Sequence, residues 1–416
     1  MDAEDVAGAW TALSEAVARR SGATPLKQDY IAALESRYRR EFTRERSDLD
    51  CAFADAMRRL VKRHPDDLEA QTLFAEALMD LKPWDYWTRD RTPKPETEEI
   101  LAALQLVLSW DPDHPGANHF FIQSVEAGPH PESGLPAADR LREYAPAAGH
   151  LVHIPSHVYL RVGQYHDAAE ANCLAAKADW DYIRHFRALG FYPGVYYPHN
   201  LHFLWWAEVF EGRGRDVLRT ARQAEEYSLD NACGPRKVLE APRLRHLPWL
   251  TLVRFGRWDE LLAVPRPADT HDFLVDRAMW HFIRGWVLAS RRQAEAAGEE
   301  HLLSGIAGSD AARSLSSPLF PVTDILKVAD RWLAARVAEA RGDSAGMVAA
   351  IEAAVAAEDA IPYMEPSYWL FPVRPAFGAA LLRSGQSVRA EDAGAVHRQF
   401  LEAWRHAEGL PDLAWY

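Results

Sequence analysis

Residues 161–179 read RVGQYHDAAEANCLAAKAD, and the fold prediction starts from their glycine, tyrosine and alanine pattern. Gly163 is placed to end one helix, because glycine adopts the left-handed conformation that closes a helix C-terminus at little cost. Tyr165 packs at the start of the next helix, and Ala168 and Ala175 leave room there for a close helix contact. The stretch therefore predicts a hairpin of two packed helices.

The hairpin pattern recurs along the chain. A unit that starts at Gly149 is preceded, 34 residues earlier, by one that starts at Pro115, and this period is that of a tetratricopeptide (TPR) repeat. Weaker copies are indicated near Pro198, Pro242, Gly342 and Gly385. No segment alternates as a β-strand does, so we expect an all-α fold: a TPR-like superhelical solenoid of helix hairpins with irregular insertions.

The pattern divides the chain into three predicted parts. Residues 1–64 are expected to form an N-terminal helical cap. Residues 65–265 are expected to form a TPR-like array that carries a histidine-rich concave face, and residues 266–416 to form C-terminal TPR-like helical repeats.

Composition excludes several classes of protein. A formal net charge of -13 argues against a nucleic-acid partner and against an anionic membrane. No apolar run approaches the roughly 18 residues of a membrane span, and the N-terminus does not resemble a signal peptide. The three cysteines form no C-x-x-C pair, so we expect buried free thiols in a reducing cytoplasm rather than disulfides.

Histidines recur at one position of the predicted repeats. In such arrays the first helix of each hairpin lines the concave surface, and the register was set by the glycine, tyrosine and alanine pattern alone. The polar and aromatic side chains that this register places on the concave surface are His119, Gln123, Glu126, His150, His153, His157, His199, His202, Trp206 and His246.

Their spacing favours a metal site. Two histidines at i and i+4 on one helix can hold the same ion, and packed helices lie close enough for a third to join them. We expect His119, His153, His157 and His199 as ligands, with Glu126 as a further ligand or a general base. Imidazole and carboxylate groups without sulfur suit Cu, Zn, Fe, Ni or Mn.

Other side chains are expected around that ion. His150 and His202 would orient ligands or transfer protons. A pocket for a small-molecule substrate would be lined by aromatic and polar residues of loops and helices, namely Gln123, Trp84, Trp87, Tyr196, Trp206, His246, Glu365 and Tyr368.

Two alternatives stay open at this stage. Histidines on a partly apolar helix face are often hydrogen-bonded packing residues. TPR-type arrays also commonly bind a peptide or partner protein on the concave face without turnover. The metalloenzyme hypothesis, with oxidative or hydrolytic chemistry, therefore competes with a non-catalytic binding module.

Four motifs resemble a family of bacterial TPR proteins. The matching strings are PWDYW at Pro83–Trp87, HPGANHFFIQSVE at His114–Glu126, GHLVHIPSHVYLRVGQY at Gly149–Tyr165 and PHNLHF at Pro198–Phe203. The similarity spans roughly residues 45–260 and implies the solenoid fold. The family has histidine where this chain has Gln123, and glutamine is a poor ligand for transition metals, so the resemblance implies a smaller ligand set or an altered activity here.

Overall fold

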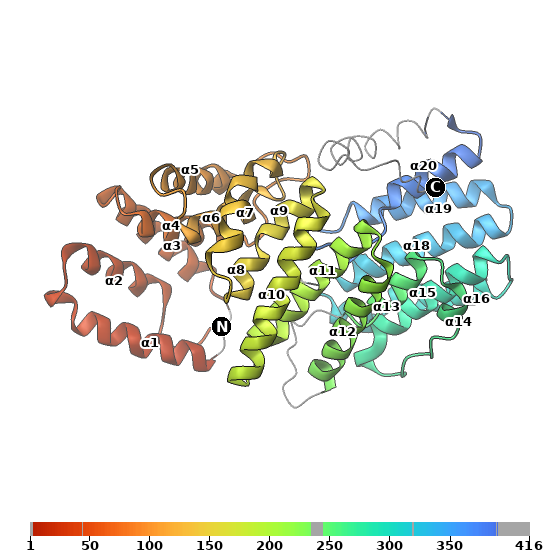
Figure 1. Cartoon of the computed structure of the whole chain (residues 1–416), viewed down its shortest axis with the longest axis horizontal. Coiled ribbons are helices and arrows are strands. Elements are labelled where there is room, and N and C mark those ends of the chain that lie inside the picture. The colour runs from red at the N-terminus through yellow and green to blue at the C-terminus, as the bar shows by residue number, and fades with distance from the viewer. Residues whose placement is uncertain (1–2, 44, 234–243, 318–319, 388, 390–416) are drawn as a thin grey trace. The chain divides into compact units, whose positions relative to one another are not determined.

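The regular secondary structure of the described residues is helical. The computed structural model describes residues 3–43, 45–233, 244–317, 320–387 and 389. Within these segments the only β-type pairings are two isolated bridges, so the predicted all-α class is confirmed (Figure 1). The helices group into two compact units, Met1–Ala145 and Pro146–Tyr416. No described helix is both long and apolar enough to cross a lipid bilayer.

The first unit contains seven α-helices among its described residues. They are α1 (Ala3–Ala18), α2 (Pro25–Arg37), α3 (Ser47–Arg63), α4 (Leu68–Met79), α5 (Pro95–Trp110), α6 (Pro115–Val125) and α7 (Leu135–Tyr144), with 3-10 turns at Arg20–Gly22 and Pro131–Gly134. Local chemistry sets their starts: Asp67 caps α4 by accepting the amide of Ala70, and proline begins α2, α5 and α6, where its missing N–H costs nothing.

The second unit carries the remaining described helices. They are α8 (Gly149–His153), α9 (Pro155–Val162), α10 (Tyr165–Phe186), the π-helical turn η3 (Tyr192–Tyr196), α11 (Tyr197–Glu211), α12 (Gly214–Cys233), α13 (Leu247–Arg254), α14 (Trp258–Leu262), α15 (Leu274–Ser290), α16 (Ala296–Ala307), α17 (Asp310–Leu315), α18 (Val322–Ala340), α19 (Ser344–Glu358) and α20 (Val373–Arg383), with a 3-10 turn at His271–Phe273.

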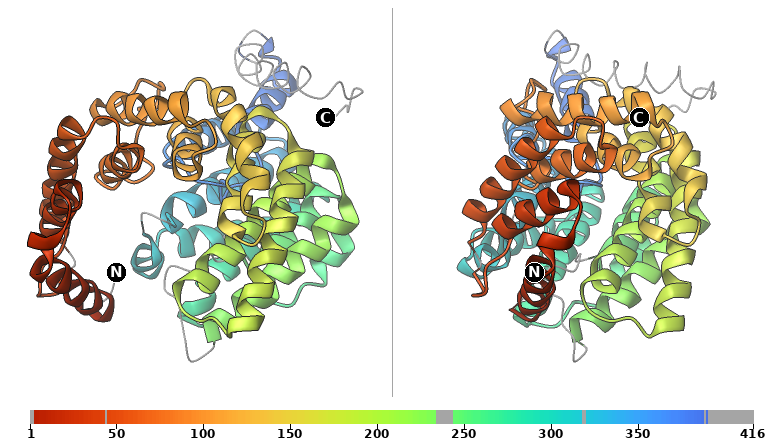
Figure 2. Two further views of the ribbon diagram at one scale, coloured as in Figure 1. Left: turned by 60° about the vertical axis from the view of Figure 1, so that its left-hand side comes forward. Right: turned by 90° about the vertical axis from the view of Figure 1, so that its left-hand side faces the viewer.

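Left-handed glycines join successive helices of the second unit. Gly163 (φ 84°) lies between α9 and α10, and Gly212 (φ 74°) lies between α11 and α12. Each donates its amide back to the helix that it closes. Positive φ angles recur at Gly256, Gly342 and Gly385. Helices on either side of such turns pack together, as α11 and α12 or α18 and α19 do, and Figure 2 shows these pairs from two further directions.

Large aromatic residues fill the core of the second unit. Trp205 of α11 is almost fully buried, and its indole Nε1 donates to the Thr251 hydroxyl oxygen of α13 at 2.8 Å. The rings of Phe282 and Trp332 lie 5.5 and 5.8 Å from that of Trp369, which belongs to the 361–372 segment. Burial of these rings anchors that segment against α15 and α18.

Two expectations need correction. The helix expected at Pro242 begins instead at Leu247, because Pro248 fits only the first helical turn; His246 is therefore the N-cap residue, and Pro242 lies outside the described residues. The cysteines expected to be buried include Cys51 and Cys173, and both are exposed because they lie on the outer faces of α3 and α10.

Candidate metal centre

Two histidines one helical turn apart form the centre of the site. His153 ends α8, His157 lies in the first turn of α9, and both side chains are buried. Pro155 separates the two helices, but the chain keeps its helical course: the Ile154 amide donates to the carbonyl of His150 and the His157 amide to that of Ile154. The two Nε2 atoms therefore face each other at 2.8 Å.

A third histidine comes from the neighbouring hairpin. His199 lies in the first turn of α11 and is partly buried. Its ring centroid is 4.8 Å from that of His153 and 6.0 Å from that of His157. One ring nitrogen from each of the three histidines lies within 4.8 Å of the other two, which is a spacing that one metal ion could bridge.

Neighbouring groups set the tautomer of His153. Asn172 on α10 donates its side-chain amide to the carbonyl of Ala168 at 2.7 Å, so its oxygen faces His153 Nδ1, also at 2.7 Å. The Ser156 hydroxyl donates to the His153 carbonyl, and its oxygen lies 3.4 Å from the same Nδ1. Both neighbours of Nδ1 act as acceptors, so this nitrogen carries the proton and Nε2 presents a lone pair.

A carboxylate sets the tautomer of His157. Glu365 Oε2 lies 2.8 Å from His157 Nδ1, and an ionised carboxylate can only accept a hydrogen bond. Nδ1 of His157 therefore carries a proton, and in the neutral form of the ring its Nε2 would present a second lone pair facing that of His153. A carboxylate behind a histidine is a common arrangement around metal-binding imidazoles, because it orients the ring and raises its basicity.

The surroundings favour the neutral forms of His153 and His199. The Phe203 ring lies 4.6 Å from the rings of His153 and His157 and 4.9 Å from that of His199. Burial holds the pKa of His153 well below its ordinary value and lowers that of His199 to about 3, and the neighbouring His157 acts in the same direction. Neutral imidazole is the form that binds metal ions.

A segment from the C-terminal part of the second unit, residues 361–372, packs against this cluster. Residues 361–372 bring Glu365 to His157, and the carbonyl of Ser367 accepts a hydrogen bond from Trp206 Nε1 at 2.9 Å. The Tyr368 ring lies 5.2 Å from that of His202. Three contacts thus fix the 361–372 segment to α9 and α11.

Two more of the expected residues lie beside the cluster. The ring of His150 is 6.0 Å from that of His153 and 4.7 Å from that of Tyr196. Burial lowers the pKa of His150 to about 4. His150 therefore lies between the three histidines and Tyr196 as a partly buried group.

A second pair of histidines is buried further along the second unit. His202 stacks on Trp205, with ring centroids 5.9 Å apart, and is 2% exposed. Burial holds its pKa well below the ordinary value, with His199 and His246 adding to the effect. Burial also lowers the pKa of His246 to about 4. Burial therefore favours the neutral form of both residues.

The remaining expected residues belong to the first unit. α6 carries His119 and Gln123 and is followed directly by the buried Glu126. Trp87 donates its Nε1 proton to the carbonyl of Ser124 at 2.8 Å, and Trp84 is 42% exposed. A role for these first-unit residues at the histidine cluster of the second unit stays a prediction.

The sequence interpretation missed three side chains of the cluster. Asn172, Ser156 and Phe203 were not expected there. A role for Asn172 could have been predicted from the sequence. It falls on the alanine-lined face of α10, where a buried polar side chain needs a hydrogen-bond partner. Phe203 and Ser156 have no comparable signal, since an apolar ring and a small hydroxyl on a helix are ordinary packing residues.

No protein-family model matches the chain, and no curated protein has a significant match to it.

Proposed function

We propose that this chain is a TPR-like metalloenzyme that holds one transition-metal ion through His153, His157 and His199 and acts on a small molecule. The observation that carries the proposal is the convergence of one ring nitrogen from each of the three histidines within 4.8 Å, with the Nε2 atoms of His153 and His157 2.8 Å apart. In two neutral rings, Nε2 atoms at that distance repel each other unless a cation lies next to both.

A metal ion can be that cation and can also bind the third histidine, which a proton shared by two nitrogens cannot do. The Nε2 atoms of His153 and His157 would hold the ion together. The third histidine would complete a set of imidazoles of the kind that Zn, Cu, Fe, Ni and Mn accept.

Three protein ligands would leave a coordination position open. An open position on a bound metal ion can polarise a substrate or activate water, whereas structural metal sites are usually closed by four protein ligands. His150 and Tyr196 lie beside the three histidines, and we expect them to contact such a substrate. This arrangement supports an enzyme, and it leaves hydrolytic and oxidative reactions both open.

The helical framework supports the TPR-like part of the proposal. Helices joined by left-handed glycines pack as successive hairpins in the second unit, as the repeat pattern predicts. The competing hypothesis, a TPR-type module that binds a peptide or protein, requires no metal ion, so metal content separates the two.

The test is the metal content of untagged protein, measured by plasma mass spectrometry before and after dialysis against a chelator. We expect close to one transition-metal ion per chain, and a loss of at least tenfold in the double variant His153→Ala, His157→Ala. The matched control is His185→Ala, His301→Ala, which removes two exposed histidines of the same unit and should leave the content unchanged.

Two outcomes would contradict the proposal. One is full metal content in the double variant with both central histidines replaced. The other is a wild-type protein that neither contains a transition metal nor takes one up on reconstitution, which would favour the peptide-binding alternative.

A further inference from the structure

A groove with four arginines lies between α12 and the turn after α13. Its cavity volume is about 710 Å³, within the range of small-molecule sites. Its lining comes from Gly214, Arg215, Leu218, Arg219, Arg222, Gln223, Glu226, Thr251, Phe255 and Arg257. None of these residues belongs to the histidine cluster.

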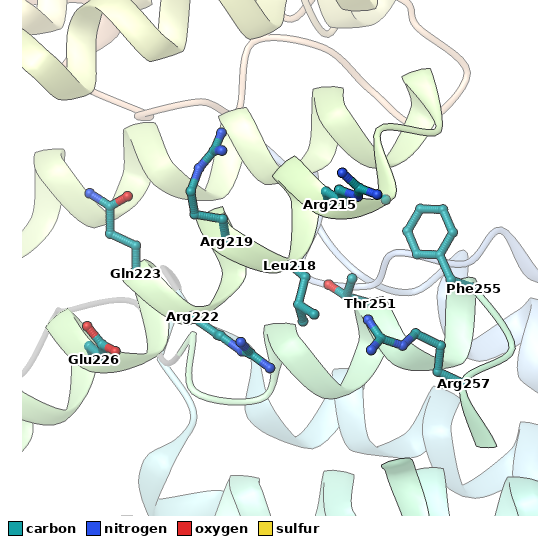
Figure 3. Close-up of a pocket in the computed structure, with 10 residues that line it drawn as sticks. Arg215, Leu218, Arg219, Arg222, Gln223, Glu226, Thr251, Phe255 and Arg257 are labelled. Atoms are coloured by element: carbon teal, nitrogen blue, oxygen red, sulfur yellow. The ribbon is translucent and has the colours of Figure 1, made fainter. Parts of the chain in front are cut away.

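The helical period places three of the arginines along one groove. Arg215, Arg219 and Arg222 follow an i, i+4, i+7 spacing on α12, so they share a face. Arg257 comes from the turn before α14. Figure 3 shows Arg222 and Arg257 extending toward the same space beside Leu218.

The charge of the groove opposes that of the chain. Four guanidinium groups and one carboxylate, that of Glu226, line it, although the whole chain has a formal net charge of -13. Arg219 pairs with Asp216 at 2.8 Å and Arg257 with Glu260 at 2.7 Å. Glu225 also interacts electrostatically with Arg222, so nearby carboxylates offset much of the positive charge that lines the groove.

The other two arginines keep their donors available. Among the described residues, the side chains of Arg215 and Arg222 form no hydrogen bond or ion pair. Like charges gathered in one groove repel each other, and an anion bound between them would relieve that repulsion. Guanidinium groups match the planar oxygen pairs of carboxylates and phosphates.

The rest of the groove is apolar. Leu218 and the partly buried Phe255 form its wall. Thr251 adds no free donor, because its hydroxyl already donates to the carbonyl of Leu247 and accepts from Trp205. A ligand that fits therefore combines a flat or apolar body with at least two negative charges.

We propose that this groove is a binding site for a small organic dianion that carries carboxylate or phosphate groups on an apolar body. The arginines of α12 and Arg257 hold the anionic groups, and Leu218 and Phe255 contact the body. The proposal is independent of the metal centre, because it rests on different residues and a different ligand.

The test is calorimetric titration with two probes in the presence of a chelator. Phenyl phosphate and isophthalate both carry about two negative charges on a benzene ring, and neutral isophthalamide is the ligand control. We expect saturable binding of one molecule per chain for at least one dianion, weaker at 200 mM salt than at 20 mM salt. The tighter of the two probes identifies phosphate or carboxylate as the preferred group.

The variants separate this groove from general surface charge. Arg215→Ala, Arg222→Ala should weaken binding about tenfold or more, because charge-assisted hydrogen bonds are lost. Arg184→Ala, Arg341→Ala removes the same charge from exposed positions of the same unit and should bind as the wild type does. Circular dichroism checks that each variant is folded. Arg222→Lys keeps the charge but loses the planar guanidinium group, so its affinity for the dianion should lie between the affinities of the two double variants.

Three results would overturn the proposal. They are no saturable binding of either dianion, equal affinities in the two double variants, and tight binding of hexaglutamate without binding of either small probe. The last would assign the groove to an acidic peptide instead.

Discussion

The chemistry of the cluster depends on which nitrogen of each ring carries a proton. Asn172 and Glu365 hold protons on the Nδ1 atoms of His153 and His157, so in the neutral form of each ring its Nε2 atom is an acceptor. The sequence predicted that the two histidines share a helix face and that Glu365 lies near the site. The protonation pattern of the histidines could not be predicted, because it depends on contacts between residues far apart in the chain.

Replacement of the carboxylate behind His157 tests this account. Glu365→Gln removes the negative charge that orients the ring and raises its basicity. We expect the dissociation constant for the bound transition metal to rise about 10- to 100-fold, as is usual when such a supporting carboxylate is lost. Competition titration with a chromophoric chelator would measure it.

Glu352→Gln is the matched control, because Glu352 forms only a surface ion pair with Arg389. Equal metal affinity in the two variants would show that the Glu365 carboxylate has no part in metal binding.

At the scale of elements, the hairpin turns and caps follow from local sequence. Gly163 ends α9 and Asp67 caps α4, because backbone geometry and a nearby side chain decide both. The break at Pro155 and the late start of α13 depend on how each proline fits its neighbours in three dimensions. The repeat register predicted that His246 lies on a helix face. The helix begins at the next residue, Leu247, so His246 precedes it, and the register alone could not predict this shift.

A buried carboxylate joins α10 to α11 and the turn before it. Asp179 accepts hydrogen bonds from Tyr192 and Asn200, each at 2.7 Å, and is 1% exposed. Burial raises its pKa to about 6 from an ordinary value of 3.8. The folded state therefore binds this proton more tightly than the unfolded state, so the group's contribution to stability is lost as pH rises through about 6.

The prediction is a difference between wild type and Asp179→Asn in metal-free protein. Asparagine does not titrate, so lowering the pH from 7.5 to 5 should raise the free energy of unfolding of the wild type, relative to the variant, on the order of 1 kcal/mol. Chemical denaturation at both pH values measures this. The exposed Asp181→Asn on the same helix should show no such change, and a pH-independent difference for Asp179→Asn would argue against a raised pKa.

At the scale of the whole molecule, binding at the cluster should stabilise parts of the chain that are distant in sequence. His157 and Glu365 are 208 positions apart. A ligand that binds only the folded state adds stability in proportion to the logarithm of its concentration over its dissociation constant. The sequence could not predict this coupling, because no local pattern records which late segment packs on an early helix.

Hydrogen exchange followed by mass spectrometry tests that coupling. Addition of the metal found in the native protein should slow amide exchange in α9, α11 and residues 361–372 together. Exchange in α16, which carries none of the cluster residues, should change little. Slowing in α9 and α11 alone would mean that the 361–372 segment does not respond to the bound ion.

The same separation of 208 positions has a consequence for the newly made chain. Ribosomes add about 5–20 residues per second, so Glu365 is synthesised roughly 10–40 s after His157. During that interval the histidines of α8, α9 and α11 have been made, while the carboxylate that orients one of them has not. All side chains of the cluster would then be present only after residue 365 is made. Synthesis of the C-terminal third of the chain would therefore set when metal binding can be completed.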